Sequence, residues 1–309
     1  TDALPSLMNA TVLDATTQPT NSNPNGPEIL LNGSLATTLN YSSGLRFRGT
    51  NCAASGFVIG NFPASGVLFD GATTMSNALT GCYVGIGADG ASRFSNGLPS
   101  VTISGGTSAT TVGGTNAAQR NVIGGSYYQG LVIRDAGTRA NVVVGNYIGV
   151  NATGTTALSN RWSAIQIFGG AQSNIIGGAV AGARNVLSGS AYQGLVIRDT
   201  GTRSNLVQGN FIGLNAAGSA ALPNAWAGLE IYGGAQANTI GGTTDTALNI
   251  ISGNLKQGVA ISGTNTTGNV VAGNFIGLNP AGNAALPNAW AGLQIFGGAK
   301  SNLIGGTSA

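Results

Sequence analysis

The chain of 309 residues contains no histidine, and its 9 acidic residues are scattered among 12 basic ones. Without histidine it cannot form a Ser-His-Asp or Cys-His catalytic centre or an imidazole metal site. Enzymes that cleave sugar chains need two carboxylates close together, and calcium sites need several. The sequence therefore predicts no metal, no cofactor and no enzymatic activity.

Charge and long apolar runs are also scarce. Charged residues make up 7% of the chain, and the net charge of +3 includes no basic stretch. This argues against a nucleic-acid partner or an anionic membrane surface. No apolar run approaches the roughly 20 residues of a membrane-spanning helix. We expect neither nucleic-acid binding nor membrane insertion.

What the chain does contain is a repeat. The block 145–178 returns as 209–242 and again as 273–306, at a fixed period of 64 residues without insertions. Such a period is typical of stacked units that each bury one face on their neighbours. Within it, short alternating runs such as LVIRD and IQIFG are interrupted by Gly or Asn, and no run has helical spacing.

These runs predict strands that align into columns. Residues two and four of each run are always apolar, whereas residues three and five are mixed, as expected for an inner and an outer face. The runs begin at Gly44, Gly66, Ser100, Gly130, Ala164, Gly194, Gly228, Gly258 and Gly292. We predict an all-β solenoid, a parallel β-helix of about eight to nine coils. Each period holds two coils, and adjoining coils lie about 4.8 Å apart.

Motifs of this chain resemble a known family. The segments GNYIGVNATG and GGAQSNIIGG, and the opening VLDATTQP with GPEILLNGS, resemble right-handed parallel β-helix repeat proteins of large secreted and surface-attached bacterial proteins. The resemblance implies a right-handed solenoid located outside the cell or at its surface. It also implies a stalk or surface module.

The two ends of the chain differ from the repeats. Residues 1–27 are rich in Thr, Asn and Pro and predict a cap or linker with one strand at 10–14, followed by the β-helix at 28–309. The last run, 292–306, lacks the strand that follows it in earlier periods. This predicts head-to-tail association of copies, or continuation into further coils of a longer chain. The candidate contact residues are Ala10, Thr11, Val12, Leu13, Leu293, Ile295, Leu303 and Ile304.

Recurring Asn and Gly at strand ends have a structural interpretation. Stacked Asn side chains form hydrogen-bonded columns and tolerate left-handed turns, and Gly supplies positive φ at corners. Two cysteines, Cys52 and Cys82, fall near corners of adjacent coils. In a secreted chain they favour a disulfide, but they do not share a column, so the sequence leaves the bond open.

Two outward rows are candidates for a ligand or for lateral contact with another chain. The three tryptophans recur in one loop, as Trp162, Trp226 and Trp290, and either fold back over the barrel or form an aromatic row for sugars. The fifth strand position alternates cation and ring along the coils, and such pairs stabilise by ~0.5–1 kcal/mol. That row contains Arg134, Phe168, Arg198, Tyr232 and Phe296.

Three functions are compatible with this organisation. The first is a non-enzymatic extracellular rod that assembles into a fibre or acts as a surface stalk, and the sequence favours it. The second is a carbohydrate-binding or adhesive module with a polysaccharide partner. The third is a polysaccharide-degrading enzyme, for which Asp135 and Asp199 are the only aligned acids, two coils apart.

Overall fold

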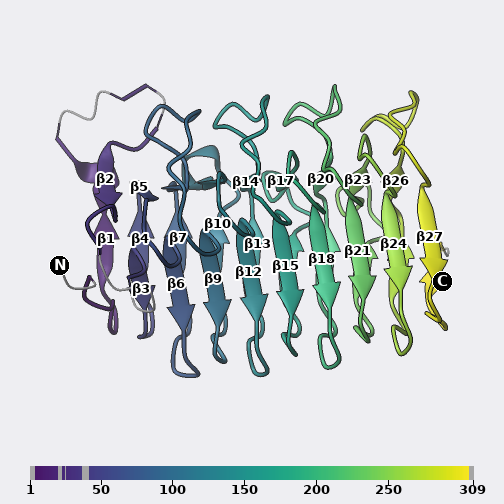
Figure 1. Cartoon of the computed structure of the whole chain (residues 1–309), viewed down its shortest axis with the longest axis horizontal. Coiled ribbons are helices and arrows are strands. Elements are labelled where there is room, and N and C mark those ends of the chain that lie inside the picture. Colours follow the sequence, from purple (N-terminus) through teal and green to yellow (C-terminus); the bar gives the residue numbers. More distant parts are fainter. Residues whose placement is uncertain (1–3, 20–22, 25, 37–41, 306–309) are drawn as a thin grey trace.

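The computed structural model describes residues 4–19, 23–24, 26–36 and 42–305. Their strands form three parallel sheets of nine, ten and nine strands, which the chain visits in turn as it winds. The coils stack along one axis, with the first and the last described coils at opposite ends of the rod (Figure 1). The predicted right-handed parallel β-helix is confirmed. No helix in the described part of the chain is long and apolar enough to cross a membrane.

Sheet A carries the runs predicted from the columns. Its strands are β3 (Leu45–Phe47), β6 (Val67–Asp70), β9 (Val101–Ser104), β12 (Leu131–Arg134), β15 (Ile165–Phe168), β18 (Leu195–Arg198), β21 (Leu229–Tyr232), β24 (Val259–Ser262) and β27 (Leu293–Phe296). Strands β6 to β27 lie side by side in Figure 1.

Sheet B follows sheet A in each coil. Its strands are β1 (Val12–Asp14), β4 (Ala53–Ser55), β7 (Ala78–Thr80), β10 (Thr111–Gly113), β13 (Val142–Val144), β16 (Ile175–Gly177), β19 (Leu206–Gln208), β22 (Thr239–Gly241), β25 (Val270–Ala272) and β28 (Leu303–Ile304).

Sheet C completes the coil. Its strands are β2 (Ile29–Asn32), β5 (Phe57–Gly60), β8 (Tyr83–Val84), β11 (Val122–Ile123), β14 (Tyr147–Ile148), β17 (Val186–Leu187), β20 (Phe211–Ile212), β23 (Ile250–Ile251) and β26 (Phe275–Ile276). Two short 3-10 turns, η1 (Ala15–Thr17) and η2 (Ala117–Gln119), lie beside sheet B.

The strand register follows the predicted columns. Leu131 pairs with Ile165 and Ile133 with Ile167, and the same alignment continues from β3 to β27. The second and fourth positions are buried in one continuous core through β24. Inward apolar side chains from all three sheets therefore hold the coils together.

The outer face of sheet A differs from the expectation in one respect. The third strand position was expected to face solvent, yet Val132, Gln166 and Val196 are only 3–7% exposed. Side chains from the corner between sheets C and A reach over this face, since Gln129, Gln193 and Gln257 hydrogen bond to residues at its third positions. A hollow lined by Trp162, Tyr192 and Trp226 lies against this face.

At the N-terminal end, strand pairing begins before residue 28. Leu7 forms a parallel bridge with Phe47, and β1 pairs with β4. The strand expected at 10–14 is present as β1, while Ala10 occupies a turn at φ +53°. Part of the segment expected to be a cap or linker thus contributes strands to the first coil.

In the last described coil, β27 and β28 pair on one side only. Ile295, Leu303 and Ile304 are 40–55% exposed there, and Leu293 is half-buried. Thr11, Val12 and Leu13 lie at the opposite end, where β1 is an edge strand. Association between these two ends stays a prediction.

Asparagines, buried except in the last described coil, form ladders at all three corners of the coil. In each ladder the side-chain oxygen accepts hydrogen bonds from the backbone N–H and side-chain N–H of the asparagine one coil earlier, at 2.8–3.4 Å. The ladder between sheets A and B contains Asn141, Asn174, Asn205, Asn238, Asn269 and Asn302. The ladder between sheets B and C contains Asn121, Asn146, Asn185, Asn210, Asn249 and Asn274, and the third corner has Asn224, Asn254 and Asn288.

The two cysteines occupy the first steps of different ladders. The backbone N–H of Cys52 donates to Asn77 between sheets A and B, and that of Cys82 donates to Asn121 between sheets B and C. Both thiols are free and buried, so the disulfide that the sequence left open is not formed. The reason is that they point inward from different corners. Burial raises the pKa of the Cys82 thiol to about 12, which keeps it protonated and unreactive.

Adjacent residues of β12 test the register. Ile133→Asp places a charge in the core, where nothing solvates it, and should cost at least about 3 kcal/mol. Arg134→Asp changes the exposed neighbouring position and should change stability by about 0.5 kcal/mol or less. Thermal melting by circular dichroism compares the two, and equal melting temperatures would contradict the register.

The ladders provide a second test. Asn210→Ala removes an acceptor from Asn185 and donors from the carbonyls of Ile176 and Gln208, so it should cost more than about 2 kcal/mol. Asn283→Ala, in an exposed loop, is the matched control and should cost less than about 1 kcal/mol. Urea unfolding measures both, and a similar loss for the two variants would show that the ladder contributes little.

Candidate functional site

One corner of the rod carries a continuous row of stacked side chains, here called the aromatic row. The Trp162 and Tyr192 rings stack at 5.6 Å between centroids, and Tyr192 meets Trp226 at 6.4 Å. The ammonium of Lys256 lies 3.0 Å from the centroid of the Trp226 ring and 4.4 Å from that of Trp290. The three predicted tryptophans are therefore brought together, with a side chain from the intervening coil between each pair.

Backbone contacts place this row. The N–H of each tryptophan donates to the carbonyl of the row member one coil earlier, as in Trp162 to Tyr128, Trp226 to Tyr192 and Trp290 to Lys256. Asn160, Asn224 and Asn288, two residues before each tryptophan, fix the loop because their side chains accept from backbone N–H groups one coil earlier. The row is thus a consequence of coil stacking at one corner.

The sequence reasoning identified the tryptophans but missed their partners. The signal was present, because Tyr128, Tyr192 and Lys256 stand in equivalent positions before Gln-Gly, one period apart. The tryptophans neither fold back completely nor stand free. Trp162, Trp226 and Trp290 are 49%, 40% and 66% exposed.

Two hollows that share Trp162 and Tyr192 form what we call the aromatic groove. The first, of about 520 Å³, is lined by Tyr127, Tyr128, Arg161, Trp162 and Tyr192. The second, of about 290 Å³, extends over sheet A and is lined by Trp162, Ser163, Gln166, Tyr192, Gln193, Val196, Trp226, Glu230 and Tyr232. The ring of Tyr192 stacks on one side of Trp162, and no other described ring stacks on Trp162. Trp162 therefore joins both hollows.

Three side-chain pairs lie across the outer face of sheet A, one in each period. Gln129 donates to Gln166, and Gln257 donates to Gln294 at 2.6 Å. In the middle period Gln193 Nε2 donates to the carboxylate of Glu230 at 2.5 Å. Because two periods fold with an amide at this position, the fold itself does not require the acid.

No described cation forms an ion pair with Glu230. Burial raises the pKa of its carboxyl, and the hydrogen bond from Gln193 opposes that effect. In the preceding period the equivalent Gln166 lies beside Arg198. In one orientation the amide oxygen of Gln166 accepts from Gln129, and in the reversed orientation it faces the guanidinium of Arg198. The residue in the place of Arg198 beside Glu230 is Ser262. The middle of the groove therefore contains a half-buried carboxyl without a counter-ion.

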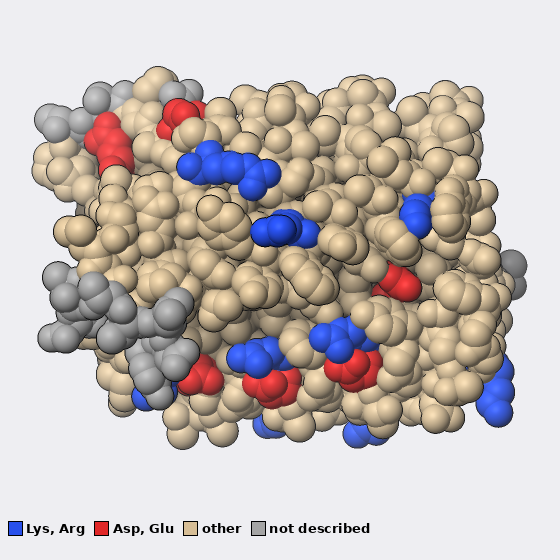
Figure 2. Space-filling model, viewed as in Figure 1, with Lys and Arg blue, Asp and Glu red and all other residues tan. Residues whose placement is uncertain are grey.

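The fifth-position row forms the other border of the groove. The Arg198 guanidinium lies 4.4 Å from the centroid of the Phe168 ring and pairs with Asp199 at 2.9 Å. Burial raises the pKa of the neighbouring Tyr232 hydroxyl, and Arg198 opposes that shift. Arg134 is exposed, and Phe296 lies 43% exposed in the last described coil. The face seen in Figure 2 is mostly uncharged, with blue and red side chains together along one edge.

Asp135 and Asp199 lie in left-handed turns, at φ +79° and +77°. Asp135 accepts from the backbone N–H of Gly105, and Asp199 pairs with Arg198. Both carboxylates thus have structural partners. Among the described residues, no three of His, Cys, Asp and Glu gather as metal ligands would.

Comparison with known proteins places the fold. No protein-family profile matches the chain, and no curated protein matches it in sequence. It is similar to the solved structure of the periplasmic alginate epimerase AlgG, with a TM-score of 0.58 and 12% identity over 87% of this chain. A point mutant of that enzyme matches with a TM-score of 0.55 and 11% identity over 86% of this chain. In both cases the match spans 56% of the other chain.

These structures correct one expectation. The sequence predicts that the chain is not an enzyme, because it lacks histidine and its acidic residues do not converge. The two solved structures compared above, which share its fold, are those of an enzyme, so that expectation is withdrawn. At 11–12% identity the similarity shows the fold and does not assign the reaction.

Glu230 provides a test of the groove's electrostatics. Because folding raises its pKa, the folded state binds more protons above the ordinary pKa of 4.5, and stability falls as pH rises through that range. Glu230→Gln, which copies the two sister periods, should raise the melting temperature at pH 7 by on the order of 1 °C. The gain should disappear below about pH 4, where both states are protonated. Melting curves across pH measure this, and a gain independent of pH would contradict it.

Proposed function

We propose that the aromatic groove binds a polysaccharide chain that lies along the rod. The observation that carries the proposal is the pair of adjoining hollows that share Trp162 and Tyr192, next to a floor of amide and carboxyl groups. Saccharides are commonly bound by apolar contact with rings together with hydrogen bonds to hydroxyl groups, and ligand sites combine apolar walls with a few convergent polar groups. The groove offers both over several coils.

Each part of the groove would make a different contact. The hollow between Tyr128 and Trp162 would hold one sugar unit against a ring, with Arg161 at its rim. Further along, Gln193 and Glu230 would hydrogen bond to hydroxyl groups. The carboxyl of Glu230 has no counter-ion, so a uronate at this position would meet a like charge. We therefore expect a neutral sugar there.

The similarity in fold to an alginate epimerase supports a polysaccharide ligand, because that enzyme is named for one. Such a ligand also agrees with a location outside the cytoplasmic membrane, as the sequence resemblance implied. Assembly into a fibre is a separate expectation, and nothing in the groove depends on it.

A second candidate function is chemistry on the bound chain, and Glu230 favours it. A half-buried carboxyl whose pKa is raised by burial is suited to act as a general acid. Incubation with neutral polysaccharides, followed by chromatography of the products, tests this. Product formed by the natural chain and not by Glu230→Gln would support it.

The binding proposal is tested with a panel of neutral oligosaccharides of six units, titrated calorimetrically. Trp162→Ala opens both hollows at once and should weaken binding by about 1–2 kcal/mol, or roughly 5- to 30-fold. The loss follows from removal of the ring that the hollows share.

Trp290→Ala is the matched control, because Trp290 belongs to the same row but lines neither hollow. It should change the affinity less than twofold. Equal losses for Trp162→Ala and Trp290→Ala, or no binding by the natural chain to any member of the panel, would refute the proposed site.

A further inference from the structure

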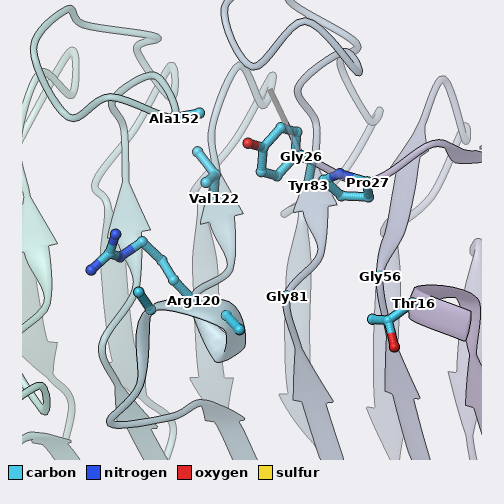
Figure 3. Close-up of a pocket in the computed structure, with 11 residues that line it drawn as sticks. Thr16, Gly26, Pro27, Gly56, Gly81, Tyr83, Arg120, Val122 and Ala152 are labelled. Atoms are coloured by element: carbon cyan, nitrogen blue, oxygen red, sulfur yellow. The ribbon is translucent and has the colours of Figure 1, made fainter. Parts of the chain in front are cut away.

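A second groove lies away from the aromatic row, along the corner between sheets B and C. Two hollows of about 270 Å³ each form it, and Arg120 lines both. One hollow extends past Tyr83 and Val122, and the other extends past Tyr147 to Arg184. Figure 3 shows the first hollow, with Arg120 extending toward the adjoining coil. We call this surface the arginine groove.

Two guanidinium groups are held rigidly in this groove. Arg120 Nε donates to the carbonyl of Gly145 at 3.3 Å, and its Cζ lies 4.1 Å from the centroid of the Tyr147 ring. Arg184 repeats the arrangement one period later, with Nε donating to Gly209 at 3.2 Å and Cζ 4.0 Å from the Phe211 centroid. Each side chain is thus fixed by a hydrogen bond and a ring, so little conformational entropy remains to be lost when a ligand binds.

Neither guanidinium has a negative partner. No carboxylate of the described residues forms an ion pair with Arg120 or Arg184. No Asp or Glu lines either hollow, although Asp245 and Glu28 adjoin the lining residues Thr246 and Pro27. Asp14 accepts a hydrogen bond from the lining residue Thr16. The Nη atoms of both arginines make no hydrogen bond to the described protein, so their N–H donors remain available.

The spacing of the two arginines indicates the shape of a ligand. They stand beside β11 and β17, which are separated by one strand, β14. Two coils correspond to about 9.6 Å along the rod. A single small anion does not span this distance, whereas an extended polymer with recurring negative groups does.

The chain's own repeat shows that the fold does not require these arginines. In the next period Leu248 occupies the equivalent position and packs in an apolar cluster that includes Phe275. An aliphatic side chain is therefore tolerated at this corner. Since the same corner also folds with leucine, its closure does not depend on an arginine.

We propose that the arginine groove is a binding site for an acidic polysaccharide, whose carboxylate or sulfate groups pair with Arg120 and Arg184 two coils apart. Guanidinium groups bind such anions through paired N–H donors. This site is independent of the aromatic groove, because it lies at another corner and shares no lining residue with it.

The experiment titrates the protein with a galacturonate hexamer and with a sulfated dextran, by calorimetry at two salt concentrations. Both probes should bind, and added salt should lower the affinity for each because the contacts are ionic. Arg120→Leu and Arg184→Leu, each a copy of Leu248, should each weaken binding about tenfold at low salt. The double variant should abolish it. Leu248→Arg should strengthen binding of longer oligomers by adding a third guanidinium.

Arg139→Leu is the matched control, since it removes an exposed arginine from another corner and should leave the affinity unchanged. Melting temperatures equal to that of the natural chain show that the variants are folded. Trp162→Ala should not affect the acidic probes, and the arginine variants should not affect neutral sugars, so failure of one site is distinguishable from failure of the other.

Three outcomes would overturn the proposal. The first is unchanged affinity in the double arginine variant, and the second is equal binding of a neutral hexamer in this groove. The third is tighter binding of a single-stranded oligonucleotide of equal charge, which would assign the groove to nucleic acid instead.

Discussion

The fold depends on the buried amide of asparagine. At each corner of a coil the backbone turns sharply, and its N–H and C=O groups leave the regular strand pairing inside the protein, where unpaired groups are costly. An asparagine side chain supplies one acceptor and two donors on a short stem. Its oxygen accepts hydrogen bonds from N–H groups of the preceding coil, while its nitrogen donates to nearby carbonyls, as in Asn210. Because every step of a ladder needs a neighbour in register, the corners fix the stacking of the coils as strictly as the core does.

Both grooves follow from this fixed stacking. Asn160 and its equivalents hold the tryptophan loops, and these loops place Trp162 and Trp226 beside the outer face of sheet A. On the other corner, the arginines directly precede the ladder residues Asn121 and Asn185, so the ladder places each guanidinium over a ring. The corners that stabilise the solenoid therefore also determine which side chains meet at its surface.

Much of the fold could be predicted from the sequence, because column purity and a fixed period are direct consequences of side-chain alternation and stacking. The strand registers of β12 to β24 match that prediction residue by residue. The cysteines could not be placed in the same way, because corner residues point in directions that a strand alignment does not specify. Contacts between side chains of different coils were still harder to predict from the sequence. Tyr192 and Trp226 are 34 residues apart, and only the folded loop shows that their rings meet. Likewise, the sequence shows that Glu230 replaces a glutamine, but not that its position is half-buried and without a cation.

The alternation of two unlike coils within each period has a consequence for how such a protein can change. Each surface position recurs once per 64 residues in the repeated part of the chain, so a duplication or loss of one period alters the length of the rod by two coils and preserves the stacking register at the junction. The number of guanidiniums or rings in a row is then a question of copy number. The number of groups that bind a long polymer can therefore grow by duplication alone. Single substitutions, such as leucine at position 248, determine which copies of the repeat contribute a binding group.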